Sequence, residues 1–560
     1  MKDTKEPQIE LAIQFLMSNE VNTAEIICRE VLLKNPFNAH AYDLLAVISS
    51  KTKRWDEALL TANKAIALDK NNGEFYTHRA IIYKNLKFFE DAISDYNQAS
   101  LLLPRSSEPL YNLAILLMEM GDLDKALELS KKAARLDPNN IHIINNLGSI
   151  FHKLGLFEQA SSSYKKSLKI NTNQPHIYNN LCGALAESDR ISESLKVCSD
   201  AIKQWPNYPE IYNAKDNALM RLNKIDEAIE TSEIAIKLQP NHSQAHYTKG
   251  MCLLLQNKLI EGWNEYTWRT RRESFWPKRS YNKPEWSGTP LKNKTLLIHW
   301  EQGYGDIIQF VRYLEILKAV IEKDKKHHNA KVIFDCPKNL LRLVKNNIIV
   351  DDIGDWGDSP PSFDFYIPLM GLAKHFTKTE DEIPKTTYIT KHIDTSIKVP
   401  KVNGRILKVG LTWSSEHKDT YRRKVCSLSQ LSKLFKNLNC TFYGIQFGNE
   451  HNQLESYTHL PNVFDLGDKL GNFAHTAAII NQLDLIISID TYVVHLAGAM
   501  GIKTWVLLPF SPDWRWQLNR SDSPWYPSIK LFRQPRPGDW GRVVENIKDK
   551  LDKNTNSKSF

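Results

Sequence analysis

Asp490, Thr491 and His495 stand at a predicted strand-to-helix turn of the kind that could hold an anion. The apolar run 485–489 is short and rich in β-branched residues, which is typical of a strand buried on both faces. It stops at Asp490-Thr491, a pair suited to capping the helix that we expect over 492–500. His495 then lies one helical turn inside the N-terminus of that helix.

A second strand after this helix would complete a βαβ unit. Gly501 is the usual residue type just beyond a helix end, and an apolar segment resumes over 503–508. In such a unit the helix N-terminus lies at the carboxyl edge of a parallel sheet, an edge that binds anions and phosphates above all. We therefore expect this turn to hold the diphosphate of a nucleotide-linked ligand.

The same strand-turn-helix pattern begins at residue 294 and starts again after residue 401. A strand over 296–300 leads through the glycine-containing turn 301–305 to Asp306, which can cap the next helix. Two such halves predict a pair of doubly wound α/β domains with a ligand cleft between them. Further strands are expected over 332–334, 364–367, 408–413, 442–446 and 463–466.

Two polar residues near predicted strand ends are further candidates for ligand contact. Gln446 ends its strand and could face a nucleotide base. Arg515 belongs to the segment Asp513–Trp516, which follows the last predicted strand at the carboxyl edge of the sheet. Its guanidinium could reach a phosphate or brace its own loop.

The first half of the chain contains residue series that recur with a spacing of 34. One is a series of small residues, which suit positions where two helices cross closely: Ala24, Ala58, Ala92, Ala126, Ala160, Ser194, Ala228 and Gly262. Another marks the ends of units with proline, which ends a helix: Pro36, Pro104, Pro138, Pro206 and Pro240. The spacing and residue types resemble the tetratricopeptide repeat (TPR), with about eight two-helix units over residues 5–276 stacked into a superhelix with a groove.

Asparagines recur in the first helix of successive units, the helix that lines the groove in this kind of array. An asparagine amide both donates and accepts hydrogen bonds, so a ladder of them could hold an extended peptide with little sequence preference. Plain solvated surface is the alternative explanation. The two columns of candidate acceptor-peptide residues are Asn112, Asn146 and Asn180, and Asn145, Asn179 and Asn213.

Length and composition bound the remaining possibilities. A chain of 560 residues is too long for one core, so two to four domains are expected. A net charge of +9 is mild and diffuse for this length, and we predict no nucleic-acid partner. The seven cysteines lack metal-site spacing, and we see no leader or membrane-spanning segment. These features predict a cytoplasmic protein without a metal site or other cofactor.

The predicted domain boundaries follow from these patterns. The segment 266–279 interleaves basic residues with tryptophan and phenylalanine, but it joins two ordered regions, so a seam between domains is favoured over nucleic-acid binding. Arg269 replaces the small residue of the earlier units, which fits a terminal repeat that docks against another domain. We predict repeats over 5–276, a linker over 277–292, α/β halves over 293–395 and 396–552, and a disordered tail over 553–560.

The second half resembles GT-B glycosyltransferases, close to the heptosyltransferase type that is found fused to TPR repeats in bacteria. The motifs that carry the resemblance are His299–Tyr313, Val409–Trp413, Asp490-Thr491 with His495–Gly498, Asp513–Trp516, Ser523–Pro527 and Leu531–Gln534. The combination of repeats and transferase is also similar to O-linked N-acetylglucosamine transferases and to bacterial enzymes that glycosylate flagellin. A GT-B domain of two Rossmann-like halves is the implied fold.

The resemblance also implies roles for individual residues. Gly305-Asp306 would supply the base, although a plain helix cap remains an alternative for Asp306. Asp490, Thr491 and His495 would bind the donor diphosphate and ribose, but Tyr492 replaces a family glycine and narrows the space near the phosphates. The family holds phosphate with hydroxyls and a lysine after the strand that ends near Trp413. The candidates there are Thr412, Ser414, Ser415, Lys418, Arg422 and Arg423, of which Arg423 or Lys418 is favoured for the leaving group.

The resemblance predicts an inverting, metal-independent transferase. It would move a sugar from a nucleotide-sugar donor to serine or threonine of a protein held in the TPR groove, with flagellin as one possible acceptor. Transfer to a saccharide or lipid-linked acceptor is the alternative within enzymes. An inactive TPR scaffold for protein assembly is the alternative outside them.

Overall fold

The computed structural model describes residues 7–390, 397–402, 404, 407–415 and 421–556. Its contacts divide the chain into two compact units, Met1–Ala201 and Ile202–Phe560. The division falls within one helix of the repeat array, so the last repeats belong to the same unit as the α/β sheets. Among the described residues, no helix is both long enough and apolar enough to cross a membrane.

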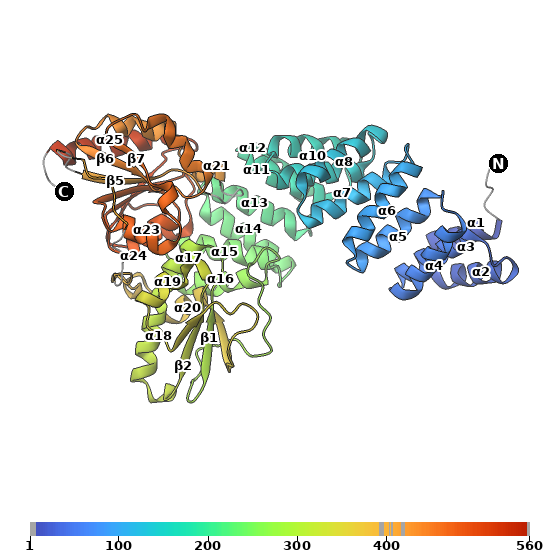
Figure 1. Cartoon of the computed structure of the whole chain (residues 1–560), viewed down its shortest axis with the longest axis horizontal. Coiled ribbons are helices and arrows are strands. Elements are labelled where there is room, and N and C mark those ends of the chain that lie inside the picture. Colours follow the sequence, from blue (N-terminus) through green and yellow to red (C-terminus); the bar gives the residue numbers. More distant parts are fainter. Residues whose placement is uncertain (1–6, 391–396, 403, 405–406, 416–420, 557–560) are drawn as a thin grey trace. The chain divides into compact units, whose positions relative to one another are not determined.

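The first unit is built from successive helix pairs, each packed against the next (Figure 1). Its helices are α1 (Pro7–Met17), α2 (Val21–Lys34), α3 (Ala39–Lys51), α4 (Trp55–Leu68), α5 (Gly73–Asn85), α6 (Phe89–Leu102), α7 (Glu108–Met120), α8 (Leu123–Leu136), α9 (Ile141–Lys153), α10 (Phe157–Ile170), α11 (Pro175–Glu187) and the start of α12 (Ile191–Gln204). The small residues of the 34-residue series from Ala24 to Ser194 are completely buried. Burial explains their size, because a larger side chain would force the crossing helices apart.

The second unit opens with the last two helix pairs. These are α13 (Pro209–Arg221) with α14 (Ile225–Leu238), and α15 (Ser243–Leu255) with α16 (Leu259–Tyr266) followed by the 3₁₀ turn η1 (Thr267–Arg271). Gly262 is the last member of the small-residue series. A side chain is excluded there, because a Cβ would lie 2.8 Å from side-chain atoms of Leu254. The predicted fold class, a helical repeat array followed by an α/β region, is confirmed.

The first sheet has four parallel strands in the order β3-β2-β1-β4. The strands are β1 (Thr295–His299), β2 (Lys331–Asp335), β3 (Asp352–Gly354) and β4 (Phe365–Pro368), and the helices that accompany them are α17 (Tyr304–Phe310), α18 (Arg312–Lys323), α19 (Lys338–Asn347) and α20 (Leu372–Phe376). The first strand lies between β2 and β4, so the strand order reverses beside its carboxyl end. Ligands of open α/β sheets bind at such a reversal.

The second sheet has six parallel strands in the order β10-β9-β8-β5-β6-β7. The strands are β5 (Leu407–Thr412), β6 (Cys440–Gly444), β7 (Val463–Asp465), β8 (Leu485–Ile489), β9 (Thr504–Leu508) and β10 (Ile529–Arg533), and the helices are α21 (Tyr421–Lys424), α22 (Leu428–Leu431), α23 (Phe473–Ile480), α24 (Tyr492–Ala499) and α25 (Trp540–Asn556). Its strand order reverses between β5 and β8, where Thr412 is paired with Ser488. A continuous apolar core covers one face of this sheet and includes Val544 and Ile547 of α25.

The predicted strands lie within one or two residues of the observed ones, and β8 is predicted without error. Two strands were not predicted, because β3 has only three residues and β10 is an edge strand whose inward side chains alternate with half-buried ones. The predicted tail is partly wrong. Helix α25 continues to Asn556, where Thr555 donates a hydrogen bond to the Leu551 carbonyl, and residues 557–560 lie outside the described residues.

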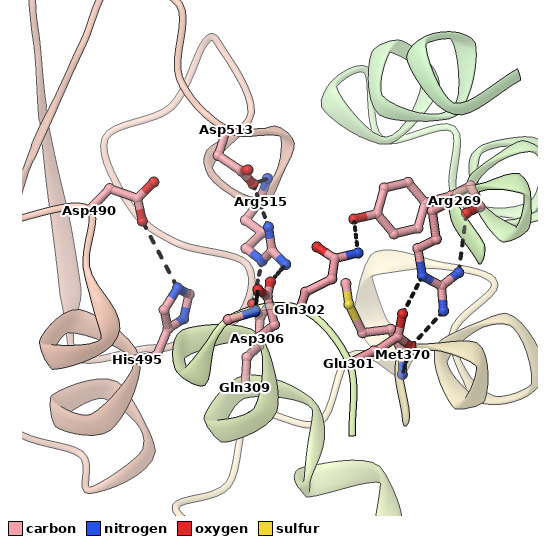
Figure 2. A network of polar contacts seen from close by, with 12 residues as sticks. Arg269, Glu301, Gln302, Asp306, Gln309, Met370, Asp490, His495, Asp513 and Arg515 are labelled. Carbon is pink, nitrogen blue, oxygen red and sulfur yellow. Dashed lines mark hydrogen bonds and ion pairs between the residues drawn. The ribbon is translucent and has the colours of Figure 1, made fainter. Parts of the chain in front are cut away.

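The terminal repeat is joined to the first sheet by a buried ion pair, as the unusual Arg269 suggested. Its guanidinium donates two hydrogen bonds of 2.7 Å to the carboxylate of Glu301, which also accepts the Met370 N–H at 2.8 Å (Figure 2). The side chains are 3% and 0% exposed. A buried charge pair of this kind is costly to break from one side, because the remaining charge has neither water nor a partner.

Replacement of Glu301 by glutamine therefore tests the strength of this seam. We expect Glu301→Gln to lower the free energy of unfolding by about 3–5 kcal/mol, measured by urea denaturation, because the Arg269 charge is left buried and uncompensated. Glu322→Gln, on an exposed position of α18, is the matched control and should change stability by less than about 0.5 kcal/mol. Equal effects of the two variants would contradict the buried pair.

Candidate functional site

Arg515 lies at the centre of a polar network that joins the carboxyl edges of the two sheets (Figure 2). It belongs to the 3₁₀ turn η8 (Trp514–Trp516) after β9. Its guanidinium forms an ion pair with Asp306 of α17, donates to Gln309 Oε1 at 2.6 Å and donates to Asp513 Oδ1 at 2.8 Å. From the sequence, Arg515 was expected either to contact a phosphate or to stabilise its own loop. In this structure its guanidinium contacts the side chains of Asp306, Gln309 and Asp513.

The environment of Arg515 is aromatic and closed to water. Its guanidinium carbon lies 4.4 Å from the centre of the Trp514 ring and 5.9 Å from that of Phe310, and the residue is 6% exposed. Trp263 of the terminal repeat lies edge-on to Trp514, with ring centroids 5.3 Å apart. Charge interactions in such a desolvated site are stronger than the same interactions in water.

Asp306 occupies the third position of α17 instead of the predicted cap position. The helix is capped at Gly303, whose N–H donates to Asp306 Oδ2 at 2.9 Å. Burial raises the pKa of the Asp306 carboxyl above its usual value, an effect that the Arg515 guanidinium opposes. A carboxylate with a raised pKa is better suited to accept a proton near neutral pH.

Asp490 and Lys424 form a second charged pair at the end of β8. Lys424 Nζ lies 2.8 Å from Asp490 Oδ2. Burial opposes the charge on Asp490, but Lys424, His495 and Arg515 together hold the carboxyl pKa below its usual value. Lys424 was not among the predicted residues. In the sequence Lys424 is one of several basic residues in a run, so nothing distinguishes it from the neighbouring lysine and arginines as a partner of Asp490.

His495 lies between the two charged pairs and is held by aromatic residues. Its ring is stacked on Trp516 at a centroid distance of 5.6 Å, and its Nδ1 lies 3.1 Å from the Tyr526 hydroxyl. Its Nε2 is 4.0 Å from Asp490 Oδ1, longer than a hydrogen bond. Burial lowers the pKa of the imidazole to about 3, so the ring is neutral at pH 7.

Helix α17 of the first half packs directly on the start of α24. A Cβ on Gly305 would lie 2.9 Å from His495 Cδ2 and 3.5 Å from Tyr492 Cα, so only glycine allows this approach. The predicted motifs Gly305-Asp306 and Asp490–His495 are thus brought together. Tyr492, the departure from the family pattern, is edge-on to Phe473, which in turn contacts Tyr304 of α17.

Of the hydroxyl residues near the strand ends, Thr412, Ser414 and Ser488 are buried and Thr491 is half-buried. Thr491 is the N-cap of α24 without a capping hydrogen bond, and its hydroxyl lies 3.3 Å from that of Ser488. Thr412 donates to the Ile445 carbonyl at 3.5 Å. The Ser414 hydroxyl is buried without a hydrogen-bond partner among the described residues.

Gln446 does not face an open base site in this structure. Its Oε1 accepts the Ser414 N–H at 2.9 Å and the Trp413 N–H at 3.2 Å, and its amide nitrogen donates to the Phe447 carbonyl. The side chain is used to fix the loop after β5, because the two N–H groups beyond the strand end need an acceptor.

The basic loop after β5 is only partly described. Lys418 lies outside the described residues, as does the side chain of Arg422. Arg423 is half-buried in α21, next to Lys424. Lys424 is therefore a residue of this segment whose charge is shown to reach Asp490.

The asparagine columns behave differently from one another. Asn146 is wrongly assigned to the groove, because it is 8% exposed and donates to the Ser130 hydroxyl of the neighbouring helix at 3.1 Å. Asn145 donates to Gln174 Oε1 at 2.9 Å, and Asn213 Oδ1 accepts from Thr248 at 3.5 Å. The remaining members, Asn112, Asn179 and Asn180, are half-buried.

Comparison with known proteins supports the assignment of the repeats. Two tetratricopeptide repeat family models match, one over residues 105–173 and one over residues 217–261. The protein FlbA of Caulobacter vibrioides is 24% identical over 316 residues, which is 52% of this chain and 52% of FlbA. The chain therefore spans about half the length of this curated relative.

Several solved structures share helical repeats with the chain. The Cut9–Hcn1 hetero-tetramer of the APC/C matches 45% of this chain and 49% of its own at 16% identity, with a TM-score of 0.37. YrrB, described as a TPR protein with an unusual peptide-binding site, matches 34% of this chain and 97% of its own at 21% identity, with a TM-score of 0.30. PilF of Pseudomonas aeruginosa matches 37% and 94% at 18% identity, with a TM-score of 0.33.

The neutral state of His495 predicts a pH dependence of stability. The folded imidazole has a pKa of about 3 and the unfolded one about 6.5, so between these values the unfolded chain binds a proton that the folded chain does not. The stability contribution is complete above about pH 6.5 and is lost as the pH falls, by up to about 1.4 kcal/mol per pH unit. His495→Gln should therefore lose less stability than the wild type between pH 7 and pH 5 in urea titrations.

The exposed His328 provides the control for this comparison. His328→Gln should follow the wild-type pH dependence, because the substitution changes an exposed surface position and leaves His495 in place. If His495→Gln also follows the wild-type curve, the imidazole is not held neutral by burial.

Proposed function

We propose that this chain transfers a sugar from a nucleotide-sugar donor to a serine or threonine hydroxyl of a protein bound by the TPR repeats. The proposal is based mainly on the ion pair between Asp306 and Arg515, which lies between the carboxyl edges of two parallel sheets. The Lys424–Asp490 pair lies beside it. A base and two cations at one buried point are what transfer from a diphosphate-linked donor requires.

Asp306 is the base in this proposal. Its carboxylate takes the proton of the acceptor hydroxyl, whose oxygen forms a bond to the anomeric carbon as the bond from that carbon to the diphosphate oxygen breaks. The nucleoside diphosphate leaves with the electron pair, and the configuration at the anomeric carbon is inverted. The raised pKa of the Asp306 carboxyl favours this role.

Arg515 and Lys424 would stabilise the departing diphosphate. In the present structure the positive charge of Arg515 is shared between Asp306 and Asp513. A bound diphosphate offers the guanidinium new oxygen partners, which would release Asp306 toward the acceptor. The N-terminus of α24, with Thr491 as its cap residue, adds a favourable dipole on the same side.

The TPR repeats would recruit the protein acceptor, and flagellin is the first acceptor to test because of the resemblance to flagellin-modifying enzymes. All of the predicted groove asparagines except Asn146 keep partial exposure. A second function, a scaffold without transferase activity, is favoured by one observation. Both oxygens of Asp306 are already engaged, by the Gly303 N–H and by Arg515.

Asp306→Asn is the direct test of transfer. We expect this variant to lower the transfer rate by about 10²–10⁴-fold, because the amide cannot accept the hydroxyl proton. Transfer is measured as the intact-mass increase of co-expressed flagellin, and in vitro as nucleoside diphosphate released from UDP, GDP or ADP sugars or CMP released from CMP sugars.

Asp381→Asn, an exposed carboxylate of the same unit, is the control and should transfer at the wild-type rate. Transfer by Asp306→Asn at the wild-type rate would remove Asp306 from the mechanism. A wild-type protein that neither transfers nor hydrolyses any donor would favour the scaffold.

Removal of residues 1–201 tests the role of the first unit. We expect the remaining compact unit to retain slow hydrolysis of the donor, because the network around Arg515 lies entirely within it. Its transfer to the protein acceptor should fall by at least about 10-fold, since most of the recruiting surface is lost. Both rates are measured on the same preparation, so that hydrolysis reports whether the truncated protein is folded.

A mass increase on the acceptor that is undiminished by the truncation would show that the first unit does not recruit it. Loss of donor hydrolysis together with transfer would show that the first unit is needed for folding or for donor binding.

A further inference from the structure

A cavity of about 560 Å³ lies between the segment 273–279 and the first sheet, separate from the residues around Arg515. Trp300 and Asp358 complete its lining. The segment is fastened to the loop after β1, because the Gln302 N–H donates to the Trp276 carbonyl at 2.9 Å. The cavity therefore has a fixed wall and lies at the carboxyl end of β1, on the same loop that leads to Asp306.

Two tryptophans belong to the apolar lining of this cavity, together with Phe275 and Pro277. Trp276 is 63% exposed, whereas Trp300 is 8% exposed, and their ring centroids are 4.7 Å apart at an angle of 70°. The exposed ring of Trp276, fixed beside the buried ring of Trp300, presents a flat apolar face to the cavity. Such a side chain offers a large contact area at a small loss of conformational entropy.

Two buried N–H donors in the lining lack acceptors among the described residues. They are Trp300 Nε1 and Arg279 Nε. The Arg279 side chain is 9% exposed and is fixed by ion pairs of 3.0 Å to Asp335 and 2.9 Å to Asp358. Buried donors are nearly always paired in native proteins, so two orphans beside one cavity show that the polar groups of its wall are not saturated by the described residues.

The charged groups around the cavity have both signs. Glu273 and Asp358 carry negative charge, and Lys278 and Arg279 carry positive charge. This balance disfavours a phosphate or another strongly charged ligand, because no single sign dominates the cavity. It suits hydroxyl groups, each of which can donate to a carboxylate and accept from an ammonium, guanidinium or indole N–H.

We propose that this cavity binds a neutral saccharide. The apolar C–H face of a pyranose ring would lie on Trp276, and its hydroxyl groups would donate to the carboxylates of Glu273 and Asp358 and accept from the Lys278 ammonium. The volume falls within the usual range for ligand sites, about 300–1,000 Å³, and is ample for one or two sugar rings. The proposal goes beyond sugar transfer, because binding here needs neither the donor nor Asp306.

The test is saturation-transfer NMR on the full-length chain with free neutral sugars. The probes are glucose, galactose, mannose, rhamnose and N-acetylglucosamine, followed by calorimetry with di- and trisaccharides of any that bind. We expect at least one probe to bind, and Trp276→Ala to weaken it by at least 10-fold while Trp276→Phe retains most of the affinity. Phe37→Ala, which removes an exposed aromatic ring of the first unit, should bind as the wild type does.

No binding by any probe would overturn the proposal, as would binding that Trp276→Ala leaves unchanged. Asp306→Asn separates this site from the proposed transferase. That variant should lose transfer and keep saccharide binding. A wild-type protein that binds a sugar but transfers none would refute the transferase and would still support saccharide binding in the cavity. A wild-type protein that transfers a sugar but binds none of the free sugars would refute saccharide binding in the cavity and would still support the transferase.

Discussion

The ion pair between Arg515 and Asp306 is the contact on which the geometry of the candidate site depends. It joins a turn that follows β9 of the six-stranded sheet to the first helix after β1 of the four-stranded sheet. The glycine at position 305 makes the contact possible, because any side chain there would collide with His495. One guanidinium thus fixes the Asp306 carboxylate of one half against the turn after β9 of the other half.

The aromatic residues around this pair keep water away from it. Trp263, which comes from the last repeat, contacts Phe310, Trp514 and Trp525, which come from both halves of the α/β region. The terminal repeat is therefore part of the wall of the site as well as a neighbour of it. The buried Arg269–Glu301 pair holds the same repeat to the loop after β1. Aromatic packing and an ion pair therefore both join the terminal repeat to the α/β region.

Most of the architecture could be predicted because it is encoded locally. The 34-residue series and the alternation of strands with helices are short-range patterns, and residues 485–501 were assigned correctly from caps and branching alone. Side-chain partners could not be predicted in this way. Asn146 is buried because Ser130 of another helix lies opposite it, Gln446 is turned to backbone N–H groups beyond its strand, and Lys424 reaches Asp490 across 66 positions of sequence.

The division between the two compact units, inside α12, has a consequence for how the chain could change in length. The helix pairs α13–α14 and α15–α16 are tied to the sheets, where Asn223 donates to the Phe510 carbonyl and Ser511 to that of Met220. These two helix pairs are therefore part of the same packed unit as the sheets. The earlier pairs contact mainly their neighbours, so whole units could be duplicated or lost there without disturbing the α/β core. The reach of the chain toward a partner can therefore evolve in steps of 34 residues, independently of its chemistry.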